Sequence, residues 1–167
     1  MFIEFGCVPL TDVSLIFSKK SKTGKRVIFG VKLESIMKSL NPDTIHPPFA
    51  RYSHGIEMPP GKRLVRTSGQ LGLAADGIVP SDSFAQAQIC FENIDFILAE
   101  ARMARADIFH VSAYVTDRAH MTGYMQARDI YFQKRSDKDL PSSTLVIVCG
   151  FTRPEFKVEV EVWACGE

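Results

Sequence analysis

Polar side chains that could bind a ligand or accept a proton gather at the ends of the predicted strands. Hydroxyl, imidazole and amide groups lie at three strand ends, and two carboxylates lie in the last strand: Tyr52, Ser53, His54, Ser68, Gln70, Ser143, Glu159 and Glu161. Each of them taken alone also suits a cap, a turn or a solvent-facing position. Carboxylates on a strand face that a second subunit covers are different, because buried charge needs a partner or a ligand.

The stretch "DLPSSTLVIV", residues 139–148, places a proline and three hydroxyl side chains directly before an apolar run typical of a buried strand. The hydroxyls of Ser142, Ser143 and Thr144 can satisfy the backbone groups of a turn. The residues alone therefore allow both an ordinary strand start and the mouth of a ligand site.

Several other chemistries have no pattern to support them. The four histidines show neither H-x-H nor H-x-x-x-H spacing, and no cysteine stands at a zinc-like interval from them. "SGQLG" lacks the glycine of a nucleophile elbow, and no phosphate-binding glycine pattern occurs. Basic residues concentrate at 19–26 without interleaved aromatic residues. We expect no metal and no cofactor, and the pattern disfavours a nucleic-acid partner.

Composition is that of one globular domain in a reducing compartment. The chain has 167 residues, 46% of them hydrophobic and 23% charged, and its formal net charge is +1. Its four cysteines are scattered without C-x-x-C pairing, which favours the cytoplasm. The longest apolar run, residues 145–151, is far below the roughly 20 residues of a membrane helix. We expect no membrane association.

Periodicity predicts the elements that hold these residues. Residues 53–70 predict a hairpin turning at "PPGK", and residues 84–101 and 121–132 predict amphipathic helices. Residues 108–117 alternate as a strand, and "TLVIVCG" and "KVEVEVWA", joined by "TRPE", predict an antiparallel pair. The order ββαβαββ indicates an α/β (α+β) fold with a single mixed sheet and both helices on one face. The other face needs cover, which we expect from another copy of the chain.

Two interpretations of residues 1–36 remain open. They form either a genuine extra arm or a dispensable extension upstream of a functional start at Met37, and we favour the second. The segment from Met37 reads "MKSLNPDTIHPP", which is polar and proline-containing like the lead into a domain. The domain is therefore expected to span residues 37–167.

The motifs "YSHGIEMPPGKRLVRTSGQLGLAADGIVP", "QAQICFENIDFILAEA", "VSAYVTDRAHMTGYMQARDIYF", "LPSSTLVIV" and "PEFKVEVEVWA" together resemble the Rid family, also called YjgF or L-PSP endoribonuclease. The resemblance runs from about Met37 to Ala164. It implies a homotrimer of chorismate-mutase-like ββαβαββ subunits with ligand clefts between them. This agrees with the sheet face left uncovered above.

The resemblance also implies a site and a reaction. The best-known members hydrolyse imines and enamines to ketoacids and ammonia without a cofactor. Carried over residue by residue, Glu159 helps to position water, and the cleft is lined by Tyr52, Ser53, Ser68, Gly69 and Gln70. In those members an arginine two residues after the proline binds the carboxylate of the substrate. This chain has Ser143 at that position.

The serine at position 143 weakens the deaminase interpretation. Loss of a bidentate guanidinium clamp forfeits roughly 1.5 to 3 kcal/mol of carboxylate binding, and Arg66 or Arg128 would have to replace it. We expect a Rid-like homotrimer that binds or hydrolyses an unidentified small metabolite between subunits. The alternative is a 2-imino or enamine acid deaminase, a cofactor-independent hydrolase of C=N bonds. An L-PSP-type endoribonuclease ranks third, because the net charge is near zero.

Overall fold

The structure, a computed structural model, describes residues 15–20, 26–31 and 37–167, and their side chains from Met37 onward. Contacts divide the chain into two units, Met1–Ile36 and Met37–Glu167. In the first unit, strands β1 (Leu15–Lys20) and β2 (Arg26–Val31) pair antiparallel. The rest of residues 1–36 lies outside the described residues, and the dispensability of this unit remains a prediction.

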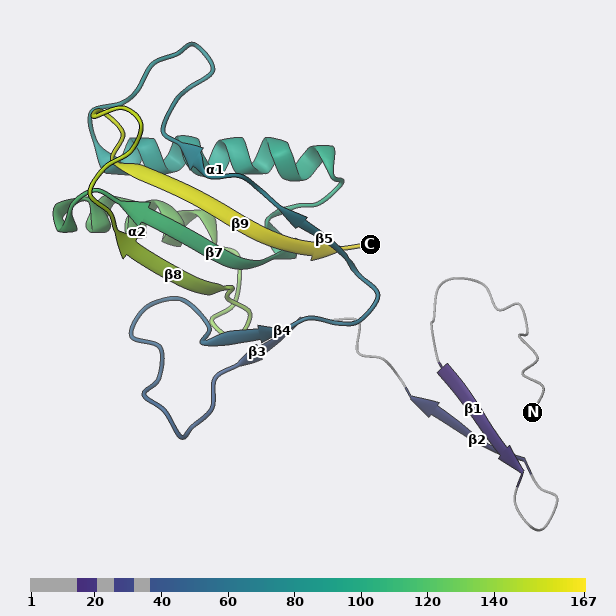
Figure 1. Cartoon of the computed structure of the whole chain (residues 1–167). Coiled ribbons are helices and arrows are strands. Elements are labelled where there is room, and N and C mark those ends of the chain that lie inside the picture. Colours follow the sequence, from purple (N-terminus) through teal and green to yellow (C-terminus); the bar gives the residue numbers. More distant parts are fainter. Residues whose placement is uncertain (1–14, 21–25, 32–36) are drawn as a thin grey trace. The chain divides into compact units, whose positions relative to one another are not determined.

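The second unit is built on a mixed sheet. Its strands follow the order β5 (Arg63–Arg66), β9 (Val158–Gly166), β7 (Ile108–Val115) and β8 (Ser142–Ile147), and the short β6 (Gln70–Leu71) also pairs with β9. Strand β9 is antiparallel to β5, β6 and β7, whereas β7 and β8 are parallel. Figure 1 shows β9 in yellow near the middle of this sheet. The predicted mixed sheet is confirmed.

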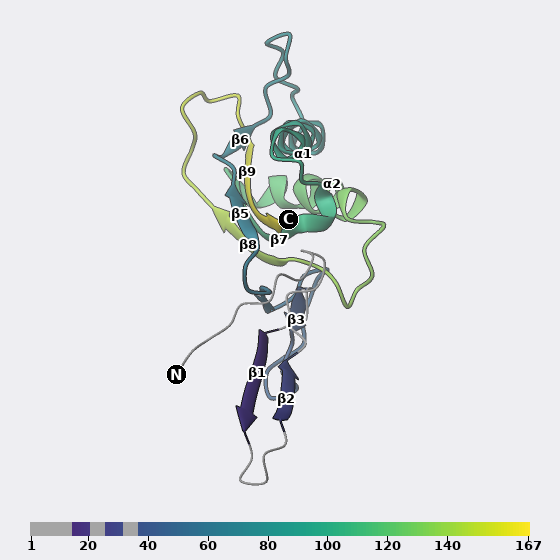
Figure 2. The same ribbon diagram turned by 90° about the vertical axis from the view of Figure 1, so that its right-hand side faces the viewer.

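Both long helices cover the same face of the sheet, as predicted (Figure 2). Helix α1 (Ser83–Glu100) begins after Asp82, whose carboxylate accepts a hydrogen bond from the Ala85 N–H at 2.8 Å. Helix α2 (Met121–Tyr131) follows a short 3₁₀ turn at Arg118–His120, and another such turn, Arg105–Asp107, precedes β7. The apolar stripe of α1 packs on β9 and on α2. The core includes Cys90, Phe91, Ile94, Leu98, Val111, Val158, Val160 and Val162.

The predicted hairpin within residues 53–70 is wrong. Strand β4 (Gly55–Glu57) pairs antiparallel with β3 (Lys38–Leu40), and β5 pairs with β9. Pro59 and Pro60 follow β4 after Met58, and proline has no N–H to donate to a strand ladder. The pairing of β4 therefore cannot continue into the next strand.

The predicted antiparallel pairing of the last two strands is also wrong. Strand β7 lies between β8 and β9, so the two strands have a common neighbour and do not pair with each other. The chain reaches β8 from β7 through α2, and such a helical crossover returns a strand in the parallel direction. The link containing "TRPE" then leads past β7 to β9.

The face opposite the helices carries polar and aromatic side chains. Along β9 the valines are fully buried beneath the helices, and the alternating Glu159, Glu161 and Trp163 are only partly buried on the other face. In the described part of the chain, no helix covers this open face, as Figure 2 shows.

Candidate functional site

Glu159 lies at the centre of a first group of candidate residues, on the open face of the sheet. Its Cα is paired with those of Leu71 on β6 and Tyr114 on β7. The Gly69 backbone lies so close that a methyl group added there would overlap the Glu159 carboxylate. Partial burial, and secondly the charge of Glu161, raise the pKa of Glu159. A carboxylate of raised pKa is a stronger base once ionised, which suits proton transfer.

The strand end Ser68, Gly69 and Gln70 borders this carboxylate. Gln70 aligns with Val160 across the β6–β9 pair, and its side-chain amide donates to the backbone oxygens of Ser68 at 3.2 Å and Gly69 at 3.4 Å. The structure thus places Gly69 against Glu159, whereas Gln70 aligns with the buried Val160 and lies on the helix-covered side. That Ser68, Gly69 and Gln70 line one ligand cleft with Glu159 remains a prediction. Only glycine at position 69 leaves space for the carboxylate.

A second group surrounds the start of β8. The Ser53 N–H donates to the Pro141 carbonyl at 3.0 Å, and Ser53 forms a parallel bridge with Ser142. Ser53 is buried, and its hydroxyl donates to the Ser39 hydroxyl at 3.1 Å. Ser143 aligns with the buried Val111, which places its side chain on the helix-covered face.

Tyr52 and Arg128 complete the second group. The Tyr52 ring packs edge-on against Phe49 and His54, with ring centroids 5.7 Å apart in both pairs. Arg128 lies on the buried side of α2, and its Nε and Nη2 donate to Asp129 Oδ1 at 3.1 and 2.8 Å. Burial raises the pKa of the Tyr124 phenol to about 12, and the charge of the nearby Arg128 opposes that rise.

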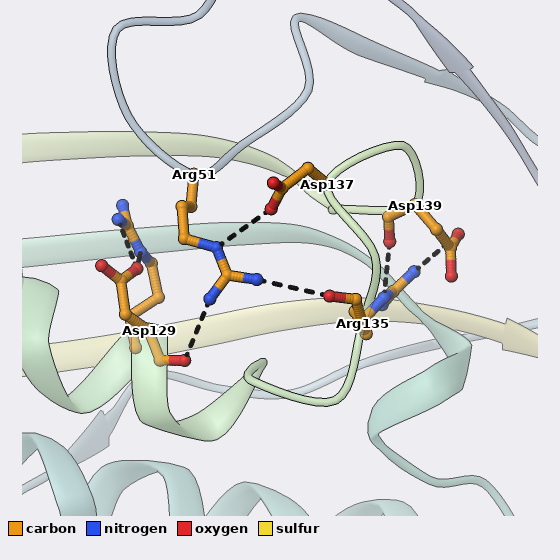
Figure 3. Close-up of polar contacts among 6 residues, drawn as sticks. Arg51, Asp129, Arg135, Asp137 and Asp139 are labelled. Carbon is orange, nitrogen blue, oxygen red and sulfur yellow. Dashed lines mark hydrogen bonds and ion pairs between the residues drawn. The ribbon is translucent and has the colours of Figure 1, made fainter.

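Arg51 attaches the Tyr52 and Ser53 segment to the loop after α2 (Figure 3). Its Nε donates to Asp137 Oδ1 at 3.3 Å, its Nη2 to the Arg135 carbonyl at 3.3 Å, and its Nη1 to the Asp129 carbonyl at 3.5 Å. Sequence reasoning missed Arg51, because its partners lie 78 to 86 residues further along the chain.

Within one chain the two groups do not meet. Glu159 faces away from the helices, whereas Ser143 faces toward them, and β7 separates their strands. A single copy therefore offers a carboxylate on one face of the sheet and hydroxyl and guanidinium groups on the other.

Arg66 is the other arginine that could replace the guanidinium missing at position 143, but it forms an ion pair with Glu161 on the open face. Its Nη2 donates to Glu161 Oε2 at 3.0 Å, and its guanidinium lies 5.2 Å from the centre of the Trp163 ring. The Tyr114 hydroxyl donates to the other oxygen of Glu161 at 3.3 Å. This network leaves Arg66 committed to Glu161 rather than to the start of β8.

Metal binding and membrane crossing can be assessed for the residues that the structure describes. From Met37 onward, no three His, Cys, Asp or Glu side chains gather as metal ligands would. Neither of the long helices there has the length and apolar character needed to cross a membrane.

Comparison with known proteins identifies the family. Residues 44–165 match the family model described as endoribonuclease L-PSP. This chain belongs to the Rid/YjgF/L-PSP family. A RutC family protein of Haemophilus influenzae is 29% identical to this Rid-family chain over 102 residues, covering 60% of the chain and 78% of the relative.

Solved structures agree with the family assignment. The Rid protein YyfB from Yersinia pestis, of unknown function, has a TM-score of 0.68 at 24% identity, covering 78% of this chain and 98% of that chain. TdcF of E. coli, solved with bound serine, has a TM-score of 0.58 at 25% identity, covering 76% and 94% of the two chains. The Rid fold predicted from the motifs is confirmed, and family membership supports small-molecule binding or deaminase-type chemistry.

Proposed function

We propose that this Rid-family chain forms a cytoplasmic homotrimer that binds or hydrolyses a small metabolite in clefts between subunits. The separation of Glu159 from Ser143 across the sheet is the observation that supports it. A cleft containing both groups needs Glu159 from one copy and the start of β8 from the next. The uncovered sheet face gives the neighbouring copy a surface to pack on.

In such a cleft Glu159 acts on water. Its carboxylate accepts a proton as the water oxygen bonds to the electrophilic carbon of the ligand. The Gly69 backbone lies close against the carboxylate, and Ser68 at the same strand end offers a further hydrogen-bonding group. This arrangement uses only groups of the chain itself.

A second candidate is 2-imino or enamine acid deaminase activity, which the burial of Arg128 near Ser143 favours. Water adds to the C=N carbon and yields a carbinolamine, and the nitrogen takes up a proton. Collapse of the carbinolamine breaks the C–N bond and releases a ketoacid and ammonia. Arg128 would replace the guanidinium that position 143 lacks.

Light scattering at micromolar concentration tests the assembly, and we expect the mass of three chains. A monomer mass would reject the proposal. Ketoacid release from 2-iminopropionate, generated by an amino-acid oxidase, tests the deaminase candidate. A wild-type rate no faster than the uncatalysed one would reject that candidate and leave metabolite binding.

Subunit mixing tests whether each site uses two copies. We pair Glu159→Gln with Ser143→Trp, which blocks the other half of the cleft, and refold them together in equal amounts. Random assembly restores about one quarter of the sites when two subunits contribute to each. Hydrolysis that stays absent in the mixture would show that both halves come from the same chain.

A further inference from the structure

Residues 41–54 form a loop between β3 and β4 that carries Tyr52 and Ser53, and we call this loop the flap. Most of the flap is exposed, and Phe49 within it is 85% exposed. The Tyr52 ring packs edge-on against Phe49 and His54, which belong to the flap themselves. Tyr52 therefore moves with the flap, and its position at the start of β8 depends on how the flap is held.

The buried attachment of the flap lies at Ser53. Its N–H donates at 3.0 Å to the carbonyl of Pro141, in the loop after α2 that comprises residues 132–141. Ser53 is only 1% exposed, so water does not compete for this bond. The Ser53 N–H can exchange with solvent only when the flap separates from Pro141, and its exchange rate therefore reports how often the flap opens.

Arg51 provides a second attachment, on the other side of Tyr52 (Figure 3). Its Nη2 donates to the Arg135 carbonyl and its Nε to Asp137 Oδ1, both at 3.3 Å. Its Nη1 donates at 3.5 Å to the Asp129 carbonyl, which lies in the last turn of α2, where the helix dipole is negative and favours a cation. Arg51 thus joins the flap both to the end of α2 and to the loop after it.

The loop that accepts these bonds is itself anchored by the side chain of Arg135. This side chain is only 9% exposed. Its Nη1 donates to the Ile108 carbonyl at 2.7 Å, and its Nε donates to the Asp139 carbonyl at 2.6 Å. These bonds fix the loop to the start of β7. The loop is therefore the fixed side of the contact with Arg51, and the flap is the movable side.

The contact between Arg51 and Asp137 is weak. The Asp137 side chain is 86% exposed and that of Arg51 is 34% exposed. An ion pair in such a position contributes little to stability, because water solvates both charges and salt screens them. The three bonds of Arg51, at 3.3 to 3.5 Å, are also long for hydrogen bonds. The attachment at Arg51 is therefore easily opened, and its strength falls as ionic strength rises.

We propose that Arg51 is a positioning residue, and that its contacts with the loop after α2 form a salt-sensitive latch that keeps Tyr52 at the ligand cleft. This inference rests on the proposed function, because it assumes that the cleft includes the start of β8, and it adds a control on access to that cleft. With the latch closed, the backbone of Tyr52 is held on both sides. With the latch open, only the bond at Ser53 remains, and the flap separates more often and takes the Tyr52 ring with it.

Hydrogen exchange of the Ser53 N–H, followed by NMR on the full chain at pH 7, tests the latch. We expect Asp137→Ala to speed this exchange about threefold, which matches the loss of one exposed ion pair. Arg51→Gln, which removes the whole guanidinium, speeds it about tenfold. Asp137→Glu restores the carboxylate and keeps the exchange near the wild-type rate. Asp43→Ala is the matched control, since it removes the same charge from an exposed position within the flap and leaves the exchange unchanged.

Salt gives a second readout, which a merely structural role of the pair would not change. Raising the salt concentration to about 0.5 M speeds the exchange in the wild type to the rate of Asp137→Ala, and has little effect on that variant. The melting temperatures of the wild type, Asp137→Ala and Asp43→Ala agree, so faster exchange of Ser53 cannot be ascribed to global unfolding. Equal exchange in wild type and Asp137→Ala at low salt, or a salt response that Asp137→Ala shares, would overturn the latch. A monomer mass in light scattering would reject the proposed function alone, because every contact of the latch lies within one chain.

Discussion

Gln86 connects α1 to the loop at Pro80 and to the segment Glu155–Lys157 that leads into β9, and we predict that Gln86→Leu destabilises the domain strongly. The side chain is fully buried in α1. Its Nε2 donates to the carbonyls of Pro80 at 2.7 Å and Glu155 at 2.9 Å, and its Oε1 accepts from the Lys157 N–H at 2.8 Å. Leucine has a similar volume but makes none of these bonds.

The magnitude follows from three lost hydrogen bonds. Each contributes about 1 kcal/mol net, and backbone groups left unpaired near the core add to the loss, so we expect a decrease of about 3 kcal/mol in the free energy of unfolding. For a domain of this size, that corresponds to a decrease of roughly 10 °C in the melting temperature.

Urea unfolding at one fixed protein concentration measures the effect, since assembly makes stability depend on concentration. Trp163, the single tryptophan of the chain, lies in β9 and reports the transition by fluorescence. Gln88→Leu is the matched control, because Gln88 is exposed on the same helix. A difference below about 1 kcal/mol between the two variants would refute the reasoning, because one net hydrogen bond alone is worth that much.

Three further predictions concern reactive groups. Gly69→Ala pushes away the movable end of Glu159, so hydrolysis falls about 100-fold with little change in melting temperature; unchanged kinetics would contradict this. The raised pKa of Glu159 means that its stabilising contribution is present at low pH and is lost as pH rises through that pKa. The melting temperature of Glu159→Gln in calorimetry should therefore equal that of the wild type at pH 3 and be equal or higher at pH 7. A variant that melts below the wild type at pH 7 would contradict this prediction. Iodoacetamide at pH 8 should label the exposed Cys149 in the native protein and spare Cys90, whose thiol pKa burial raises, as read by peptide mass spectrometry; equal labelling would count against the buried position.

Local patterns predicted the helices well, and strand pairing poorly. The apolar spacing from Phe84 to Ala101 depends only on neighbours within the helix, and α1 follows it. The partner of β8 depends instead on the crossover through α2 and on the free edge of β7. Neither can be read from a short stretch of sequence. Turn residues in "TRPE" are equally suited to a hairpin and to a longer link.

The candidate site was predictable where residues matched motifs. The motif around Ser68 to Gln70 and the position of Glu159 lead to neighbouring residues in the structure. Arg51 belongs to a segment without a periodic pattern, where a charged residue is expected in solvent. Only its contacts with the loop after α2 distinguish it, and those depend on the packing of segments that lie 78 to 86 residues apart.

The central position of β9 constrains the order in which the strands of the sheet can assemble. Strands β5, β6, β7 and β8 all precede β9 in the chain, yet β5 and β6 join the sheet only through β9. A nascent chain lacking Val158–Gly166 can form the β7–β8 pair but has no ladder to connect it to the rest. During translation β5 and β6 can therefore join the sheet only after β9 has left the ribosome, and the part of the α1 stripe that packs on β9 stays uncovered until then.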